Sequence, residues 1–388
     1  MGLIRVAACH ASPVFLSARE TTEKAISLIQ EAARNGANLV VFPESYIPAF
    51  PIWSALRPPT HNHALFQRMA LASVHADGDG AEVSAIRAAA RRLGVLVSIG
   101  LSEKVRASSA TLYNANLIIG SDGDVLVHHR KLMPTFYEKL TWAPGDGYGL
   151  RVADTPFGRI GNLICGENTN PLARYALMAQ GEQIHISSWP AVWPTRFSGA
   201  GAATQREERG EEGMRDSSGG KATSSVGRGA NYDNVSANRT RAAAHCFEAK
   251  CFGVLCAGFL GADAIQATAS GSGNEEAIAR ELEGSQRGAT MFLDPKGALL
   301  PGFVVNKDTA AHEPTDMLQD REGILYADMD LDDCIEGKQY HDVVGGYQRL
   351  DVFELKVDRS RRQPANFVGR ADADLFQDVT LDKGNSEV

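Results

Sequence analysis

Short apolar runs alternate with stretches of helical periodicity along the first part of the chain. Residues 3–9, 39–42 and 95–100 are mainly apolar runs of the length expected for buried strands. Between the first two runs, four side chains recur at spacings that place them on one helical face: Thr22, Ile26, Ile29 and Ala33. A second such face precedes the third run: Val83, Ile86, Ala90 and Leu93. Strands that alternate with helices predict an α/β fold.

The ends of these two helices carry capping residues. Ser17 and Glu20 have the spacing of a capping box, in which each side chain bonds to a backbone N–H of the first turn. Gly36 and Gly94 follow the two apolar faces, and glycine is the residue most often found just beyond a helix C-terminus. We therefore expect one helix between Ser17 and Gly36 and another that stops at Gly94.

Two hairpins of similar design are expected later in the chain. Residues 114–119 and 125–129 flank one turn, and residues 289–293 and 298–303 flank the other. Their similarity predicts a core built from two sheet halves. The remaining apolar runs predict three further strands and two helices, over residues 159–165, 184–188, 252–257, 170–180 and 234–250.

One segment interrupts this pattern. Residues 198–228 are rich in Gly, Ser, Glu and Arg, a composition that cannot bury enough surface to offset the entropy of ordering. We interpret the segment as a disordered surface insertion. Two alternatives for its origin are a flexible loop near subunit contacts and an artefact of the gene model, such as a retained intron. We expect one domain over residues 1–360 and a frayed polar tail over residues 361–388.

Charge and cysteine content narrow the class of protein. The 388 residues carry a formal net charge of -8, which argues against a nucleic-acid-binding protein. No apolar run approaches the ~20 residues that cross a bilayer, and the N-terminus lacks the basic and apolar segments of a signal peptide. None of the six cysteines forms a C-x-x-C pair. We therefore expect reduced thiols, no metal site and a cytoplasmic protein.

Three chemically capable side chains stand at the ends of predicted strands, where catalytic groups of α/β proteins collect. Glu44 follows an apolar strand, Lys131 leaves the first hairpin, and Cys165 lies between a strand and a helix. Singly, each has a simpler interpretation, as a solvated carboxylate, a surface charge or a core thiol. Gly166 allows a tight turn with room for a substrate, and the following helix can lend positive charge to a thiolate. The combination predicts a cysteine nucleophile.

Five segments carry a family pattern: FPES at 42–45, HRKLMPT at 129–135, EKLTWAPGDG at 138–147, GNLICGENTNPLARYALMAQGEQIHISSWP at 161–190 and ANYDNVSANRTRAAAHCFEAKCFGV at 230–254. In these segments the chain resembles the nitrilase superfamily of carbon–nitrogen hydrolases, and most closely its nitrilase branch. The resemblance runs from Arg5 to about Val357, apart from the insertion. It implies a four-layer αββα sandwich that assembles into homo-oligomers, either dimers or longer spirals, and that needs no metal or organic cofactor.

The resemblance also implies catalytic roles. Glu44 would be the general base, Lys131 would stabilise tetrahedral intermediates, and Cys165 would attack the substrate. Glu138 matches the family's second glutamate, which positions the lysine or the substrate. The implied reaction converts an organic nitrile into the carboxylic acid and ammonia through thioimidate and thioester intermediates. One alternative is an amidase or nitrile-hydrating enzyme with the same site, and another is a non-catalytic scaffold.

Substrate recognition is expected to differ from that of many relatives. Many nitrilases carry Trp where this chain has Gly166, and His where it has Phe136. We expect Tyr46, Phe136 and Trp189 to contact the substrate. Together with Trp193, these aromatic side chains indicate a nitrile that bears an aromatic or arylaliphatic group.

Overall fold

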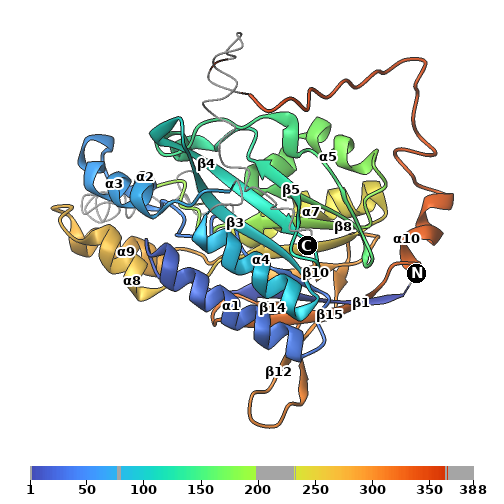
Figure 1. The fold of residues 1–388 in the computed structure, drawn as a ribbon, viewed down its shortest axis with the longest axis horizontal. Coiled ribbons are helices and arrows are strands. Elements are labelled where there is room, and N and C mark those ends of the chain that lie inside the picture. The colour runs from blue at the N-terminus through green and yellow to red at the C-terminus, as the bar shows by residue number, and fades with distance from the viewer. Residues whose placement is uncertain (1, 77–79, 198–230, 232, 363–364, 366–388) are drawn as a thin grey trace, which may run out of the picture.

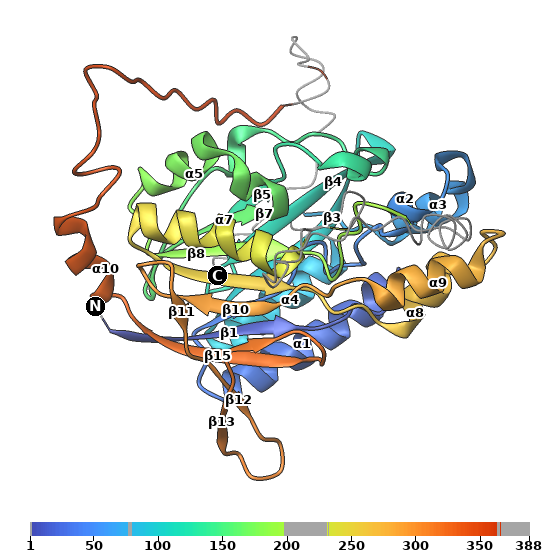
Figure 2. The ribbon, with the colours of Figure 1, turned by 180° about the vertical axis from the view of Figure 1, so that it is seen from behind.

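Two β-sheets lie face to face at the centre of the molecule, with helices against their outer faces (Figures 1 and 2). The computed structural model describes residues 2–76, 80–197, 231, 233–362 and 365. The insertion predicted at residues 198–228 lies outside this part of the chain, as does most of the tail predicted at 361–388. None of the helices described is long and apolar enough to cross a membrane.

The first sheet contains the N-terminal strand near its middle. In spatial order its strands are β13 (His312–Pro314), β12 (Phe303–Val305), β15 (Gly323–Asp330), β1 (Leu3–His10), β2 (Leu39–Val41), β3 (Leu96–Val105), β4 (Ser108–Ile119) and β5 (Val125–Arg130). β1, β2 and β3 run parallel, and the other neighbours pair antiparallel. The β4–β5 pair confirms the first predicted hairpin.

The second sheet is also parallel at its centre and antiparallel at its edges. Its order is β11 (Leu299–Leu300), β10 (Thr290–Leu293), β9 (Phe252–Ala257), β8 (Ile184–Trp189), β7 (Gly158–Ile164) and β6 (Ala153–Thr155). β14 (Met317–Leu318) pairs with β10. β7, β8 and β9 are the parallel strands.

Helices complete the layers on both sides. Those longer than one turn are α1 (Ala18–Arg34), α3 (His63–Ala72), α4 (Ala81–Leu93), α5 (Pro171–Met178), α7 (Asn234–Ala249), α8 (Ala262–Ala269) and α9 (Glu275–Gly284). α1 and α4 cover the first sheet, whereas α5 and α7 cover the second (Figures 1 and 2). This arrangement confirms the expected αββα sandwich. The short turns are α2 (Trp53–Leu56), α10 (Asp333–Glu336), η1 (Pro59–His61), η2 (Phe136–Leu140), η3 (Gly147–Gly149), η4 (Cys165–Thr169) and η5 (Gly337–Gln339).

Alternation along β1 shows how the layers are held together. Val6 and Ala8 face the second sheet and pack in one buried cluster with Ile186 and Val254. Their neighbours on the strand point the other way, toward α1 and α4. Successive side chains of a strand lie on opposite faces, so a strand between two layers must be apolar on both. This is why the run 3–9 is nearly uninterrupted.

Two local predictions are wrong in detail. Ser17 is the N-cap of α1, but its side chain makes no capping hydrogen bond, so the predicted capping box is not formed. The second hairpin pairs β10 with a β11 of only two residues, and Phe303 pairs with Tyr326 in the first sheet instead. Pro301 has no N–H to continue the β11 ladder, so the chain leaves one sheet there and enters the other.

Candidate active site

A buried lysine joins two carboxylates at the edge where the two sheets meet. Lys131 directly follows β5, and its Nζ donates to Glu44 Oε1 at 2.8 Å. The same ammonium donates to both oxygens of Glu138, at 2.9 and 2.7 Å. All three side chains are fully buried. The structure therefore brings together three residues that the sequence places far apart or on separate elements.

Burial and charge together set the protonation of this cluster. Burial lowers the pKa of Lys131, but its electrostatic interactions with Cys165, Glu138 and Glu44 outweigh burial and raise the pKa well above its usual range. For Glu138, burial is the largest effect, and it raises the pKa to about 7 although the Lys131 charge opposes it. Near neutral pH the cluster thus combines a firmly charged ammonium with a carboxyl group that can take up a proton.

Cys165 lies at a sharp turn beside this cluster. It begins η4 directly after β7, with a φ of 52°, in the left-handed region that side chains other than glycine rarely adopt. Its thiol and one carboxylate oxygen each from Glu44 and Glu138 lie within 4.8 Å of one another. Burial raises the pKa of the thiol well above its usual range, so the resting side chain is protonated and needs a base for activation.

The helix predicted over residues 170–180 begins where the sequence places it. α5 starts at Pro171, and its first N–H groups bond to the side chain of Asn170. The backbone N–H of Gly166 bonds to the thiol instead, which favours the thiolate. The charge of Lys131 and the N–H of Gly166 are therefore the interactions that favour the thiolate.

Glu167 ties the cysteine turn to the lysine segment. Its carboxylate accepts from the backbone N–H of Ile164 at 2.8 Å and from the N–H of Leu132 on the other segment. His129 Nε2 lies 2.9 Å from the same carboxylate. Burial raises the pKa of Glu167, but His129 and these backbone N–H groups outweigh it and lower the pKa overall. A charged carboxylate thus links the strands that carry Lys131 and Cys165.

Gly166 has a steric reason to be glycine. A Cβ atom at this position would lie 2.6 Å from the hydroxyl of Thr135, closer than two nonbonded atoms approach. Thr135 caps η2, and its backbone N–H donates to Glu138 Oε2 at 2.8 Å. The space that a larger residue at 166 would need is therefore filled by the cap that holds Glu138.

Asn114 is a site residue that sequence reasoning did not identify. Its amide donates to Glu44 Oε1 at 2.7 Å, and its backbone carbonyl accepts from the N–H of Lys131 at 2.7 Å. The predicted hairpin contained the signal, because its register places residue 114 beside the end of the partner strand. With Oε1 occupied by two donors, Glu44 Oε2 is buried without a hydrogen-bond partner among the described residues.

The donor set of this site does not favour a metal ion. Glu44, Glu138 and Cys165 offer ligand atoms close enough to share an ion. However, the ammonium of Lys131 already bonds to both carboxylates, and it would repel a cation placed between them. The positive charge that a metal would supply is thus provided by a side chain.

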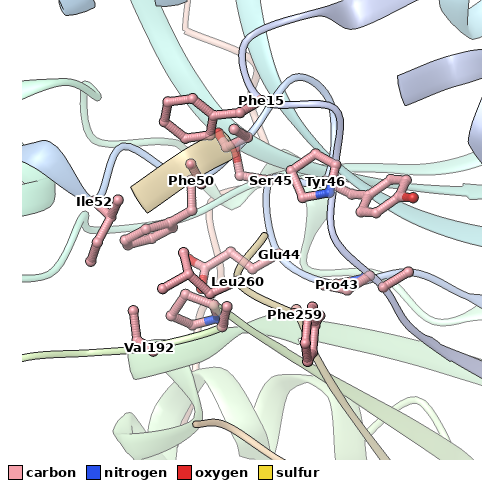
Figure 3. Close-up of a pocket in the computed structure, with 17 residues that line it drawn as sticks. Phe15, Pro43, Glu44, Ser45, Tyr46, Phe50, Ile52, Val192, Phe259 and Leu260 are labelled. Atoms are coloured by element: carbon pink, nitrogen blue, oxygen red, sulfur yellow. The ribbon is translucent and has the colours of Figure 1, made fainter. Parts of the chain in front are cut away.

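An apolar pocket opens beside Glu44 (Figure 3). Aromatic and aliphatic side chains from four parts of the chain line it, among them Phe15, Phe50, Ile52, Val192, Phe259 and Leu260. Tyr46 also lines it, but its hydroxyl points away from the pocket (Figure 3) and donates to the carbonyl of Ser12 at 3.2 Å. The glutamate is the only charged side chain of this lining.

A second, narrower pocket contains Cys165. Trp189 and Trp193 line it, and it shares Pro190 and Val192 with the apolar pocket. The indole N–H of Trp189 is buried and has no hydrogen-bond partner in the part of the chain that the structure describes. The two pockets adjoin, so a small molecule can reach the thiol with one end and the apolar lining with the other.

Phe136 lies apart from both pockets. Its φ of 50° turns the ring outward at the start of η2, where 68% of the residue is exposed. It lines a surface pocket on the other side of the segment, together with Lys139 and Gly166. The structure therefore places Tyr46 and Trp189 beside the predicted catalytic residues and does not place Phe136 there.

The chain is similar to known proteins along most of its length. A model of the carbon–nitrogen hydrolase family matches residues 5–339. A nitrilase of Penicillium rubens is 32% identical over 94% of this chain and 96% of its own length. An arylacetonitrilase of Hypocrea virens is 31% identical over 92% of each chain. An aliphatic nitrilase of Rhodococcus rhodochrous is 31% identical over 93% of this chain and 84% of its own.

Solved structures share the fold at lower identity. A carbon–nitrogen hydrolase from Helicobacter pylori is 18% identical, with a TM-score of 0.59 over 90% of this chain and 97% of its own. Nit3 of Saccharomyces cerevisiae, a member of branch 10 of the nitrilase superfamily, is 15% identical with the same TM-score and the same coverage. These structures support the two-sheet architecture.

Proposed function

This chain belongs to the carbon–nitrogen hydrolase family, and we propose that it hydrolyses organic nitriles to the carboxylic acid and ammonia, with Cys165 as the nucleophile. The observation that carries the proposal is the convergence of a thiol and two carboxylates around one buried ammonium. Relatives named as nitrilases are similar over nearly the whole chain, which favours a nitrile as the substrate.

Attack on the nitrile needs a base because the thiol is held protonated. Glu44 is the proposed general base, since its free Oε2 can accept the proton from Sγ. The sulfur then forms a bond to the nitrile carbon. One π pair of the C≡N bond moves to nitrogen, which takes up the proton from Glu44, and the product of this step is a covalent thioimidate.

Water completes the reaction in two further additions. The first water adds to the thioimidate carbon while Glu44 takes its proton, which gives a tetrahedral adduct. Glu44 passes that proton to the nitrogen, the hydroxyl proton of the adduct follows it as the C–N bond breaks and the C=O bond forms, and ammonia leaves a thioester behind. A second water adds in the same way, and the acid departs as Sγ regains its proton. Lys131 stabilises the charged nitrogen or oxygen at each stage, a role typical of preorganised donors.

Glu138 is the proposed positioning residue for Lys131. Both of its oxygens accept from Nζ, and the backbone N–H of Thr135 holds one of them. This leaves the ammonium little freedom to turn away from the reacting carbon. Correct orientation of reacting groups is an important source of rate enhancement. The arrangement therefore suits a reaction in which charge develops on nitrogen at one stage and on oxygen at another.

The substituent of the nitrile is proposed to be apolar and uncharged. Its place is the pocket lined by Phe15, Phe50 and Val192, in which hydroxyl groups are already engaged. A carboxylate or ammonium in this lining would lose its water without gaining a partner. Trp189, with its unpaired indole N–H, is the proposed donor on the cysteine side.

The alternative is an amidase or nitrile-hydrating enzyme that uses the same residues. The tetrahedral adduct decides between them, because loss of ammonia leads to the acid whereas loss of the thiol releases the amide. We would incubate the parent chain with matched nitriles and amides, and quantify ammonia, acid and amide. Ammonia from amides but not from any nitrile would overturn the nitrilase proposal in favour of the amidase.

Cysteine variants test the nucleophile directly. Cys165→Ala should abolish hydrolysis and the covalent adduct seen by intact-protein mass spectrometry. Cys334→Ala is the matched control, since Cys334 is a buried cysteine on α10 that lines neither pocket. Hydrolysis that survives in Cys165→Ala would contradict the mechanism.

We further propose that residues 1–360 act as one domain of a cytoplasmic homo-oligomer. All six cysteines are unpaired and buried, which is consistent with a reducing compartment. Leu172 on α5 and Phe247 on α7 are large apolar side chains exposed on the same outer layer, which a contact between copies of the chain would cover. Light scattering coupled to size-exclusion chromatography should give a mass of at least two chains, and a single-chain mass would contradict assembly.

A further inference from the structure

A second buried polar cluster lies behind the nucleophile turn and lines neither pocket. Glu182 precedes β8, His185 lies within β8 and His245 lies on α7. His185 Nδ1 is 2.9 Å from one oxygen of Glu182, and His245 Nε2 is 2.7 Å from the other. The two imidazole rings stack with centroids 3.5 Å apart. The ligand atoms of the three side chains lie within 4.8 Å of one another, and in this structure they are joined by these hydrogen bonds.

Hydrogen bonds connect this cluster to Cys165 through Asn168. The amide nitrogen of Asn168 donates to the carbonyls of Leu163 at 3.1 Å and Cys165 at 2.9 Å. Its oxygen faces His185 Nε2 at 2.8 Å and accepts from Ser187 at 3.0 Å. The amide cannot be reversed, since its oxygen would then face two carbonyl oxygens. His185 Nε2 must therefore donate.

The other ring nitrogen of His185 faces Glu182. Burial raises the pKa of Glu182, but its interactions with His185 and His245 outweigh burial and lower the pKa to about 2. The carboxylate is therefore ionised. His245 stays neutral, because burial and its electrostatic interaction with His185 lower its pKa to about 4. Its Nδ1 also has no partner among the described residues.

The remaining titratable groups around the cluster do not change this assignment. Arg174 on α5 adds to the lowering of the His245 pKa, and Cys251, between α7 and β9, is held as a thiol because burial raises its pKa. The cluster thus consists of two imidazole rings held by one carboxylate, with His185 Nε2 directed at Asn168.

We propose that His185 is a positioning residue for the nucleophile, an inference that rests on the proposed role of Cys165. His185 Nε2 donates to Asn168 and fixes the direction of its amide. Asn168 then holds the two carbonyls that flank the turn, and so keeps Cys165 in its left-handed conformation beside Glu44. A backbone conformation of this kind persists only where its surroundings enforce it.

Two substitutions separate positioning from packing. A glutamine side chain places its amide nitrogen near Nε2 of a histidine, so His185→Gln retains the donor to Asn168 and loses the hydrogen bond to Glu182. An asparagine side chain places its amide nitrogen near Nδ1, so His185→Asn does the reverse. Both variants remove the imidazole ring, and they differ in whether they retain the hydrogen bond to Asn168, which leads to the nucleophile.

The readouts are kcat, KM and the rate at which iodoacetamide alkylates Cys165, followed by peptide mass spectrometry. We expect His185→Asn to lower kcat and the alkylation rate by about tenfold or more with little change in KM, because small misplacements of reacting groups are costly. His185→Gln should retain most of both rates. If His185→Asn is alkylated at the rate of the parent chain, or if the two variants lose equally, the proposal is wrong.

A further variant keeps the test available if His185→Asn does not fold. Asn168→Asp preserves the acceptor for His185 and Ser187 but cannot donate to the carbonyls of Leu163 and Cys165. Its alkylation rate should also fall about tenfold, and an unchanged rate would overturn the proposal. Alkylation needs no substrate, so this result is separate from the proposed function: a chain that hydrolyses no nitrile would still test the positioning of the thiol.

Discussion

Replacing Glu138 with glutamine should change how the stability of the protein depends on pH. The side chain keeps its shape, but the buried carboxyl group can no longer ionise. In the parent chain, burial raises the pKa of Glu138 from 4.5 to about 7. One pKa unit corresponds to about 1.4 kcal/mol, so this shift is worth about 3 kcal/mol. The group is completely buried, and solvent therefore does not screen the effect.

The sign of the effect follows from proton binding. A folded-state pKa above the unfolded value means that the native state holds the proton more tightly, so this contribution to stability is complete below about pH 4.5. It is lost as the pH rises toward 7. Because glutamine does not ionise, Glu138→Gln does not lose this stability as the pH rises. The free energy of unfolding of the variant, relative to the parent, should therefore increase by about 3 kcal/mol across this interval.

The glutamine amide cannot reproduce both hydrogen bonds that Lys131 donates to Glu138. Their loss changes the free energy of unfolding of the variant by an amount that does not depend on pH. Lys131 stays charged throughout the interval because its pKa lies well above the usual range. Only the pH-dependent part of the difference therefore reports the titration of the carboxyl group.

Urea unfolding followed by tryptophan fluorescence at several pH values measures these free energies. The matched control is Glu283→Gln, an exposed glutamate on α9, which should preserve the pH dependence of the parent chain. The reasoning is refuted if the free energy of unfolding of Glu138→Gln, relative to that of the parent, stays constant with pH or decreases as the pH rises.

Three further substitutions test the site. Lys131→Met should lower kcat about 10²–10³-fold, as expected for the loss of a donor to a charged intermediate, and an effect below tenfold in ammonia release would contradict its role. Gly166→Ala should lower the free energy of unfolding by about 1–3 kcal/mol. The loss should be smaller in a chain that already carries Thr135→Ala, because the hydroxyl that the new Cβ atom would meet is then absent. Thermal unfolding measures both losses, and they should differ. Phe50→Ala should shift kcat/KM toward bulkier nitriles, whereas Leu71→Ala, exposed on α3, should leave the preference unchanged.

Local sequence patterns were sufficient to predict most helices and strands, but not which strands pair with one another. The helix over α4 ends at Gly94 as predicted, because the periodicity and the C-cap are both local features. The prediction that residues 298–303 form one strand of the second hairpin is wrong, because Phe303 pairs with Tyr326 in the other sheet. Which sheet a short strand joins depends on distant residues that no local window contains.

The sequence by itself determined the α/β architecture, the family resemblance and the three residues of the proposed catalytic site, since each depends on periodicity or on contiguous motifs. Only the tertiary structure decided that Glu44, Lys131 and Cys165 meet, because they follow strands of two different sheets. It also decided that Phe136 faces outward while Glu138, two residues later, turns inward on a tight 3₁₀ turn. The raised pKa of Glu138 and the network behind Cys165 arise from burial, a property of the packed molecule rather than of any segment.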